Sequence, residues 1–185
     1  MIYLVIGTPD SGKSALAEEL AVGTEDGHKV YLATMKICDE AGKKRVERHR
    51  AQRAGKGFET IEMEYDICTV LESIDEPQDT TILLECVSNL VGNEMYDNPH
   101  RKMDLPKEAD LFADEMLFRI KELAEEIASD VKVLADAVSN IVMVTNEYEK
   151  EAEGYDDETR LYVLLLSMVN EKISTFSDKV IKVGV

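Results

Sequence analysis

The segment GTPDSGKS, residues 7 to 14, matches the phosphate-binding pattern G-x-x-x-x-G-K-[ST] and lies between an apolar stretch and a helical one. In such a loop (P-loop) the glycines let successive backbone N–H groups point inward, and the following helix adds partial positive charge. Lys13 would then reach the β and γ phosphates, and the Ser14 hydroxyl would ligate Mg²⁺. A chance glycine–serine turn is the alternative, but the flanking strand and helix favour a triphosphate site.

A second phosphate-site group is expected at the end of a buried strand next to this loop. Glu85 directly follows the apolar run TTILL, residues 80 to 84. A carboxylate in that place can order Mg²⁺ or its waters. A carboxylate that is only solvated at a strand end is the alternative, and glutamate in place of the usual aspartate leaves direct metal ligation open.

A cationic segment stands out at residues 43 to 53, KKRVERHRAQR, with six basic residues and one acid. Charge runs usually mark a solvated helix face, and that interpretation stays open. The functional alternative is chemical, because a neutral imidazole at His49 can attack phosphorus. Flanking guanidinium groups would lower the pKa of His49 and spread the charge that develops on a departing pyrophosphate.

The bulk composition limits the classes of partner and compartment. A formal net charge of −17 should repel nucleic acid, so an anionic ligand needs a local concentration of positive groups. With 185 residues and 44% hydrophobic content, we expect one domain spanning 1–185. No apolar run approaches the roughly 20 residues of a membrane span, and the three cysteines lack paired spacing, so we expect a cytoplasmic protein.

The elements that must position these groups follow from hydrophobic patterning. Strands are predicted at 2–6, 29–34, 58–63, 80–84, 141–145 and 179–183. Helices are predicted at 14–20, 39–53, 67–74, 86–95, 159–176 and 107–137, the last with a break near Ser129. The proline-containing segment 97–106 reads as a loop and is the best place for an insertion or a mobile lid. Alternating strands and helices predict an α/β fold, a P-loop NTPase-like (RecA-like) three-layer sandwich with a mostly parallel central sheet.

Together these parts resemble the bifunctional adenosylcobinamide kinase/adenosylcobinamide-phosphate guanylyltransferases of cobalamin assembly, nearly end to end. The resemblance is carried by GTPDSGKS, YLATMKICDE (31–40), RVERHRAQR (45–53), ILLECVSNLVGNE (82–94) and VTNE (144–147). It implies phosphorylation of adenosylcobinamide, then transfer of GMP from GTP onto the new phosphate through a covalent intermediate on His49. It further implies Mg²⁺ as cofactor, GTP and ATP as substrates, and a homo-oligomer, for example a trimer.

The same resemblance assigns the site residues one by one. Catalytic roles fall to His49 and Lys13, and the metal ligands would be Ser14 and Glu85. The implied nucleotide-binding positions are Gly7, Thr8, Pro9, Asp10, Ser11, Gly12, Lys13, Ser14, Ala33, Thr34, Met35, Arg50, Ala51, Gln52, Arg53, Glu62 and Glu85. The match at Glu62 requires a one-residue gap near Gly55.

Two features depart from the family pattern. Thr8 and Asp10 stand where a second glycine and a basic residue are usual, and the acidic YEKEAEGYDDE replaces an apolar, glycine-containing loop after VTNE. Two alternatives therefore stay open. One is a P-loop small-molecule kinase with only one of the two activities, and the other is a nucleotide-binding regulatory module without turnover.

Overall fold

A single six-stranded sheet forms the centre of the computed structural model, which describes residues 1–25, 27–36, 40, 44, 55–105, 112–148 and 154–184. The strands are β1 (Ile2–Gly7), β2 (His28–Ala33), β3 (Phe58–Glu62), β4 (Thr80–Glu85), β5 (Asn140–Asn146) and β6 (Lys179–Val183). Their order is β3-β2-β4-β5-β1-β6, and every neighbouring pair is parallel. All six strands therefore end at the same border of the sheet, which we call the carboxyl edge.

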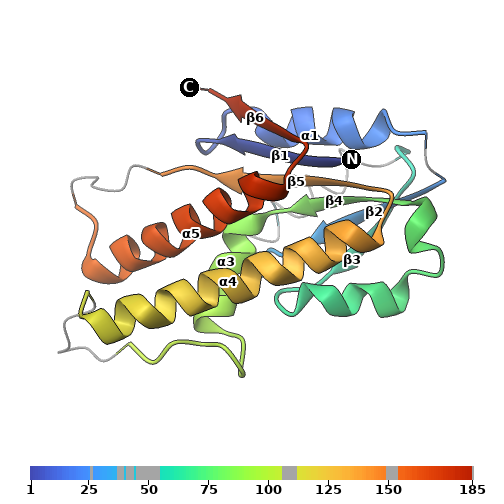
Figure 1. Cartoon of the computed structure of the whole chain (residues 1–185). Coiled ribbons are helices and arrows are strands. Elements are labelled where there is room, and N and C mark those ends of the chain that lie inside the picture. The colour runs from blue at the N-terminus through green and yellow to red at the C-terminus, as the bar shows by residue number, and fades with distance from the viewer. Residues whose placement is uncertain are drawn as a thin grey trace.

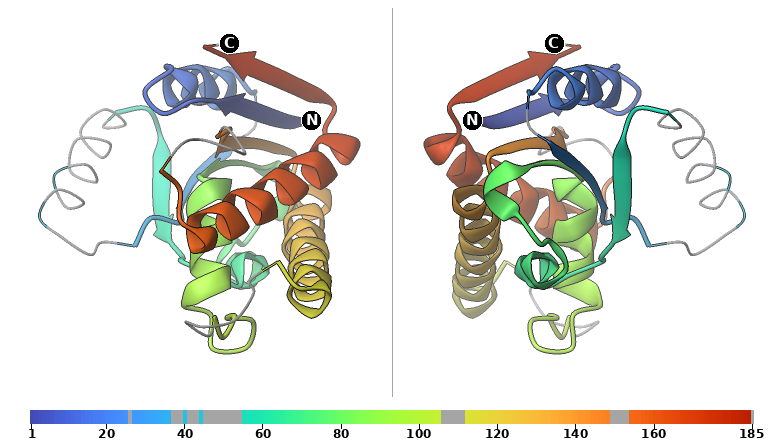
Figure 2. Two further views of the ribbon diagram at one scale, coloured as in Figure 1. Left: turned by 90° about the vertical axis from the view of Figure 1, so that its left-hand side faces the viewer. Right: turned by 90° about the vertical axis from the view of Figure 1, so that its right-hand side faces the viewer.

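Helices cover both faces of this sheet (Figure 1). On one face lies α1 (Lys13–Val22), and on the other lie α3 (Val87–Tyr96), α4 (Asp114–Ala137) and α5 (Asp157–Phe176). Figure 2 shows this layering from two sides, with α1 separated from the other three helices by the strands. The predicted α/β three-layer sandwich is thus confirmed, with a sheet that is parallel throughout its six described strands.

The core follows the two-residue period of the strands. Alternate side chains of β1, β4 and β5 enter a large cluster beneath α3, α4 and α5, while those between them pack against α1. Thr80 to Leu84 are all buried, as predicted from the continuous apolarity of this run. On the other face, Ala17 and Ala21 are the buried residues by which α1 approaches the strands.

Two predictions about helices were wrong. α4 continues through Ser129, because that serine is exposed while Ile127 and Val131 keep the apolar stripe on the core. The predicted helix at 67–74 is a 3₁₀ helix, η1 (Ile67–Ser73), whose buried residues Ile67 and Val70 are three positions apart. A three-residue periodicity suits the 3₁₀ geometry. A second short 3₁₀ helix, η2 (Pro77–Asp79), was not predicted.

The described part of the loop after α3 is anchored, contrary to the predicted mobile lid. Asn98 is fully buried, and the Met103 N–H donates to the carbonyl of Met95, the two atoms being 2.8 Å apart. The predicted helix at 39–53 falls almost entirely outside the described residues, as do 106–111. No helix in the described part of the chain has the length and apolarity needed to cross a membrane.

Candidate nucleotide-binding site

The P-loop lies at the carboxyl edge because β1 ends at Gly7 and α1 begins at Lys13. Gly12 adopts φ 86°, a left-handed conformation that favours glycine, and Asp10 adopts a similar φ of 58°. The N-cap residue of α1 is Gly12, which has no side chain to accept hydrogen bonds from the first turn of the helix. Its backbone N–H groups and the positive end of the helix dipole therefore suit an anion.

Lys13 is held close to the loop that precedes it. Its side chain is largely buried, and Nζ donates to the Thr8 carbonyl at 2.9 Å. Burial lowers the pKa of Lys13, although the nearby Cys86, Glu85 and Asp10 act to raise it. A bound triphosphate would supply the anionic partner that favours the charged ammonium.

The two predicted metal ligands are adjacent in space. Ser14, in the first turn of α1, donates a hydrogen bond from Oγ to Oε1 of Glu85, the last residue of β4. A hydroxyl and a carboxylate, both oxygen donors next to a phosphate loop, fit the coordination preferences of Mg²⁺. The side chains present are therefore compatible with the implied magnesium ion.

The predicted pocket residues of β2 and β3 lie beside Glu85. Ala33 pairs with Glu85 on one side and with Glu62 on the other, so the two carboxylates flank β2 on one face of the sheet. Thr34 is fully buried, and its hydroxyl is hydrogen-bonded to the backbone of Cys86. The Thr34 hydroxyl is therefore already engaged within the fold, while Met35 next to it is half-buried.

Sequence reasoning missed a polar cluster around Asn146, the last residue of β5, which lies between β4 and β1 in the sheet. Asn146 pairs with Gly7, and its Nδ2 donates to Ser88 Oγ at 2.9 Å and to the Tyr148 hydroxyl at 3.0 Å. The Cys86 thiol lies 3.0 Å from the same Ser88 oxygen, and burial raises the pKa of that thiol. Asn146 lies within VTNE, but neither its type nor its spacing predicts a role.

The end of β6 forms a further wall of the P-loop that sequence reasoning also missed. A Cβ on Gly7 would come within 2.6 Å of the Val183 carbonyl oxygen. Gly184, with φ 75°, lies against Ser11, since a Cβ there would be 2.8 Å from the Cβ of that serine. No local pattern predicts this contact, because the residues involved are far apart in the sequence.

The cationic segment cannot be placed against this site. His49, Arg50, Ala51, Gln52 and Arg53 lie outside the described residues. Their proximity to the P-loop therefore stays a prediction.

Comparisons with known proteins identify the family of the chain. A family model described as cobinamide kinase / cobinamide phosphate guanyltransferase matches residues 3–184. The chain is 30% identical over 183 residues to the bifunctional adenosylcobalamin biosynthesis protein CobU of Escherichia coli K12, covering 97% of this chain and 93% of the relative. It is 27% identical over 180 residues to the protein of the same name from Salmonella typhimurium LT2, with the same coverage. The chain therefore belongs to the cobinamide kinase / cobinamide phosphate guanyltransferase family, whose members are bifunctional enzymes of cobalamin biosynthesis.

Proposed function

We propose that this protein phosphorylates the aminopropanol hydroxyl of adenosylcobinamide and then transfers GMP from GTP onto the new phosphate, giving adenosylcobinamide-GDP. The observation that carries the proposal is the convergence of Lys13, Ser14 and Glu85 at the start of α1, within a chain that matches the family from end to end. The same site serves both steps, because each breaks a phosphoanhydride bond of a nucleoside triphosphate.

In the kinase step the substrate hydroxyl oxygen bonds to the γ phosphorus of ATP or GTP, and the bond to the β–γ bridging oxygen breaks. The hydroxyl proton passes to a base or water, and the nucleoside diphosphate leaves. Lys13 and the N–H groups of the P-loop stabilise the charge on the phosphates. Ser14 and Glu85 would hold Mg²⁺, which when bound offsets further negative charge.

In the guanylyl transfer an imidazole nitrogen of His49 bonds to the α phosphorus of GTP, and pyrophosphate leaves. A phosphate oxygen of adenosylcobinamide phosphate then bonds to the same phosphorus, and the phosphorus–nitrogen bond breaks to release the neutral imidazole. Arg50 follows His49 directly and Arg53 comes four positions after it, and their charge would stabilise the departing pyrophosphate. Transfer of GMP in these two displacements requires a nucleophilic histidine, which a simple kinase does not require.

Incubation with Mg²⁺ and GTP labelled at the α phosphate tests the histidine intermediate. We expect acid-labile label on the wild-type protein and none on His49→Ala. His100→Ala is the matched control, because His100 is exposed in the loop after α3 and should leave labelling intact. His28 serves equally well, since it begins β2 at the edge of the sheet opposite the P-loop.

The kinase reaction of the same variants separates the remaining possibilities. His49→Ala should still phosphorylate adenosylcobinamide, because that step uses no covalent carrier. A wild-type protein that phosphorylates but takes no label would be a kinase with one activity. A protein that binds nucleotide but neither takes label nor turns over would be a regulatory module.

Two further parts of the proposal have their own tests. Glu85→Gln should raise the Mg²⁺ concentration needed for half-maximal kinase activity, because one anionic oxygen is removed from the Ser14–Glu85 pair. An unchanged Mg²⁺ requirement would remove Glu85 from the metal site.

We also propose a homo-oligomer, for example a trimer, on the strength of the resemblance, and light scattering that gave a monomer would contradict it.

A further inference from the structure

Asn93, on α3, connects two loops at the carboxyl edge. Its Nδ2 donates to the Thr34 carbonyl at 2.7 Å and to the Glu64 carbonyl at 2.8 Å. The first carbonyl directly follows β2, and the second lies just beyond β3. Asn93 is itself buried, and its bond to Thr34 is shielded from water. Neither the family description nor the names of the relatives assigns this residue a role.

Backbone bonds extend this connection across three strands. The Met63 N–H donates to the Ala33 carbonyl at 2.9 Å, and the Thr34 N–H donates to the Glu85 carbonyl at 3.0 Å. These bonds join the ends of β3, β2 and β4 in turn. Asn93 adds a side-chain bridge between the loops that follow β2 and β3. It thereby fixes the end of β3, which carries Glu62, relative to the end of β4, which carries Glu85.

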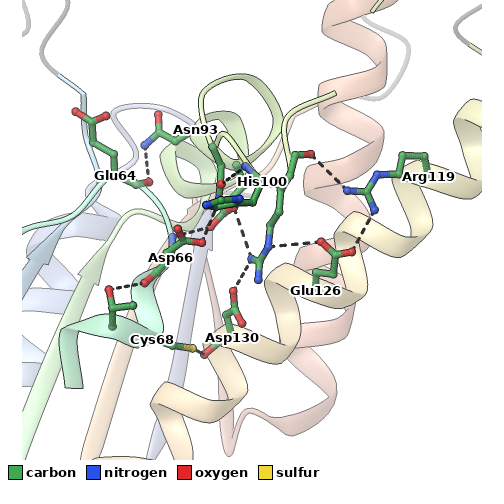
Figure 3. A network of polar contacts seen from close by, with 12 residues as sticks. Glu64, Asp66, Cys68, Asn93, His100, Arg119, Glu126 and Asp130 are labelled. Carbon is green, nitrogen blue, oxygen red and sulfur yellow. Dashed lines mark hydrogen bonds and ion pairs between the residues drawn. The ribbon is translucent and has the colours of Figure 1, made fainter. Parts of the chain in front are cut away.

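Further polar groups form a network next to this end of α3 (Figure 3). Glu94, which is almost fully buried, accepts from the Asp66 N–H at 2.9 Å and from Asn98 Nδ2 at 2.7 Å. Asn98 also donates to the carboxylate of Asp66 at 2.9 Å, and Arg101 reaches Asp130 on α4. Asn93 and Asn98 are thus two buried asparagines of one region, but only Asn93 contacts the Thr34 and Glu64 carbonyls.

We propose that Asn93 is a positioning residue of the nucleotide site. It fixes the loops after β2 and β3, which would contact the nucleoside, and does not affect binding of the triphosphate by the P-loop. The inference rests on the proposed function and on the family resemblance, which implies that Ala33, Thr34, Met35 and Glu62 bind the nucleotide. The P-loop belongs to β1 and α1, and none of the hydrogen bonds of Asn93 reaches it. Loss of the Asn93 amide should therefore affect binding of the nucleoside but not binding of the triphosphate.

Calorimetric titration with two probes in the presence of Mg²⁺ tests the proposal. Inorganic tripolyphosphate reports the P-loop alone, whereas GTP reports the P-loop together with the loops after β2 and β3. Asn93→Ala should weaken GTP binding by about tenfold, as expected for two lost hydrogen bonds near a binding site, and change tripolyphosphate binding by less than about twofold. Asn98→Ala is the matched control and should lower thermal stability while leaving both affinities near the wild-type values.

Three results would overturn the proposal. GTP affinity could be unchanged in Asn93→Ala, both probes could weaken equally, or Asn98→Ala could weaken GTP binding as much as Asn93→Ala does. If Asn93→Ala does not fold, Asn93→Ser retains one donor and should show the same selective loss for GTP, by a smaller factor. A wild-type protein that binds tripolyphosphate but not GTP would instead refute the proposed function itself.

Discussion

Replacing Gly7 by alanine tests how tightly β6 closes on the P-loop. The new Cβ would lie 2.5 Å from Ser11 Oγ and 2.6 Å from the carbonyl oxygen of Val183. The Ser11 hydroxyl can rotate away, because it has no hydrogen-bond partner among the described residues. The Val183 carbonyl belongs to the backbone and must retreat by about 0.4 Å to reach the 3.0 Å limit for such contacts.

The magnitude follows from what this retreat disrupts. Val183 pairs with Gly7 at the end of the β1–β6 ladder, so moving it weakens a backbone hydrogen bond worth about 1 kcal/mol. Overpacking adds about 1–3 kcal/mol. A total near 3 kcal/mol corresponds to a fall in Tm of roughly 6–12 °C for a protein of this size.

Gly12→Ala is the matched comparison for Gly7→Ala. A Cβ at Gly12 meets nothing within 4 Å, so that variant suffers only from its left-handed φ of 86°. Its cost should be about 1–2 kcal/mol. Urea unfolding and thermal melting of both variants measure the difference. A Gly7→Ala protein as stable as wild type would refute the conclusion that the end of β6 is pressed against the P-loop.

Three other measurements follow from the charges of the molecule. Because burial lowers the pKa of Lys13 and a triphosphate would restore its charge, Mg·GTP binding should take up protons increasingly as the pH rises, as calorimetry in buffers of different ionisation enthalpy would show. Burial raises the pKa of Glu94, so the contribution of this group to stability is complete below about pH 4.5 and is lost as the pH rises through the folded pKa. In urea unfolding, the free energy of unfolding of the wild type should therefore fall relative to that of Glu94→Gln as the pH rises. A difference that stays constant with pH would contradict this. Raising the ionic strength from about 0.01 to 0.15 M should speed the association of Mg·GTP in stopped-flow experiments, since screening weakens the repulsion by a chain of net charge −17.

The sequence predicts well whatever depends on neighbouring residues. The apolar run before Gly7, the loop and the start of α1 form one continuous segment, so motif and context could be recognised together. The burial of Thr80 to Leu84 likewise follows from their own apolarity. Placement of Glu85 beside Ser14 needed one further step, that parallel strands end at a common edge.

Prediction failed where distant residues decide the outcome. The polar segment after α3 resembles a solvated loop, yet Asn98 is buried because Asp66, 32 positions earlier, and Glu94 accept its amide hydrogens. Polar residues read as exposed unless their partners are known, and spacing does not reveal partners. The contact of Gly184 with Ser11 joins the two ends of the chain and has no local signal either.

The acidity of the chain and its proposed ligand, an anion, can be reconciled by the range of each force. Charges on the surface act through water over about 8–10 Å and influence mainly how fast an anion arrives. The affinity for a bound anion would depend on groups at contact distance, which are the backbone N–H groups at the start of α1 and Lys13, whose burial removes competing water. Glu85 adds negative charge beside the phosphates only if no cation intervenes, and its contact with Ser14 places that carboxylate where Mg²⁺ would be held. A carboxylate in this position would make the proposed triphosphate site dependent on the metal, so the acidic character of the chain and phosphate binding are compatible.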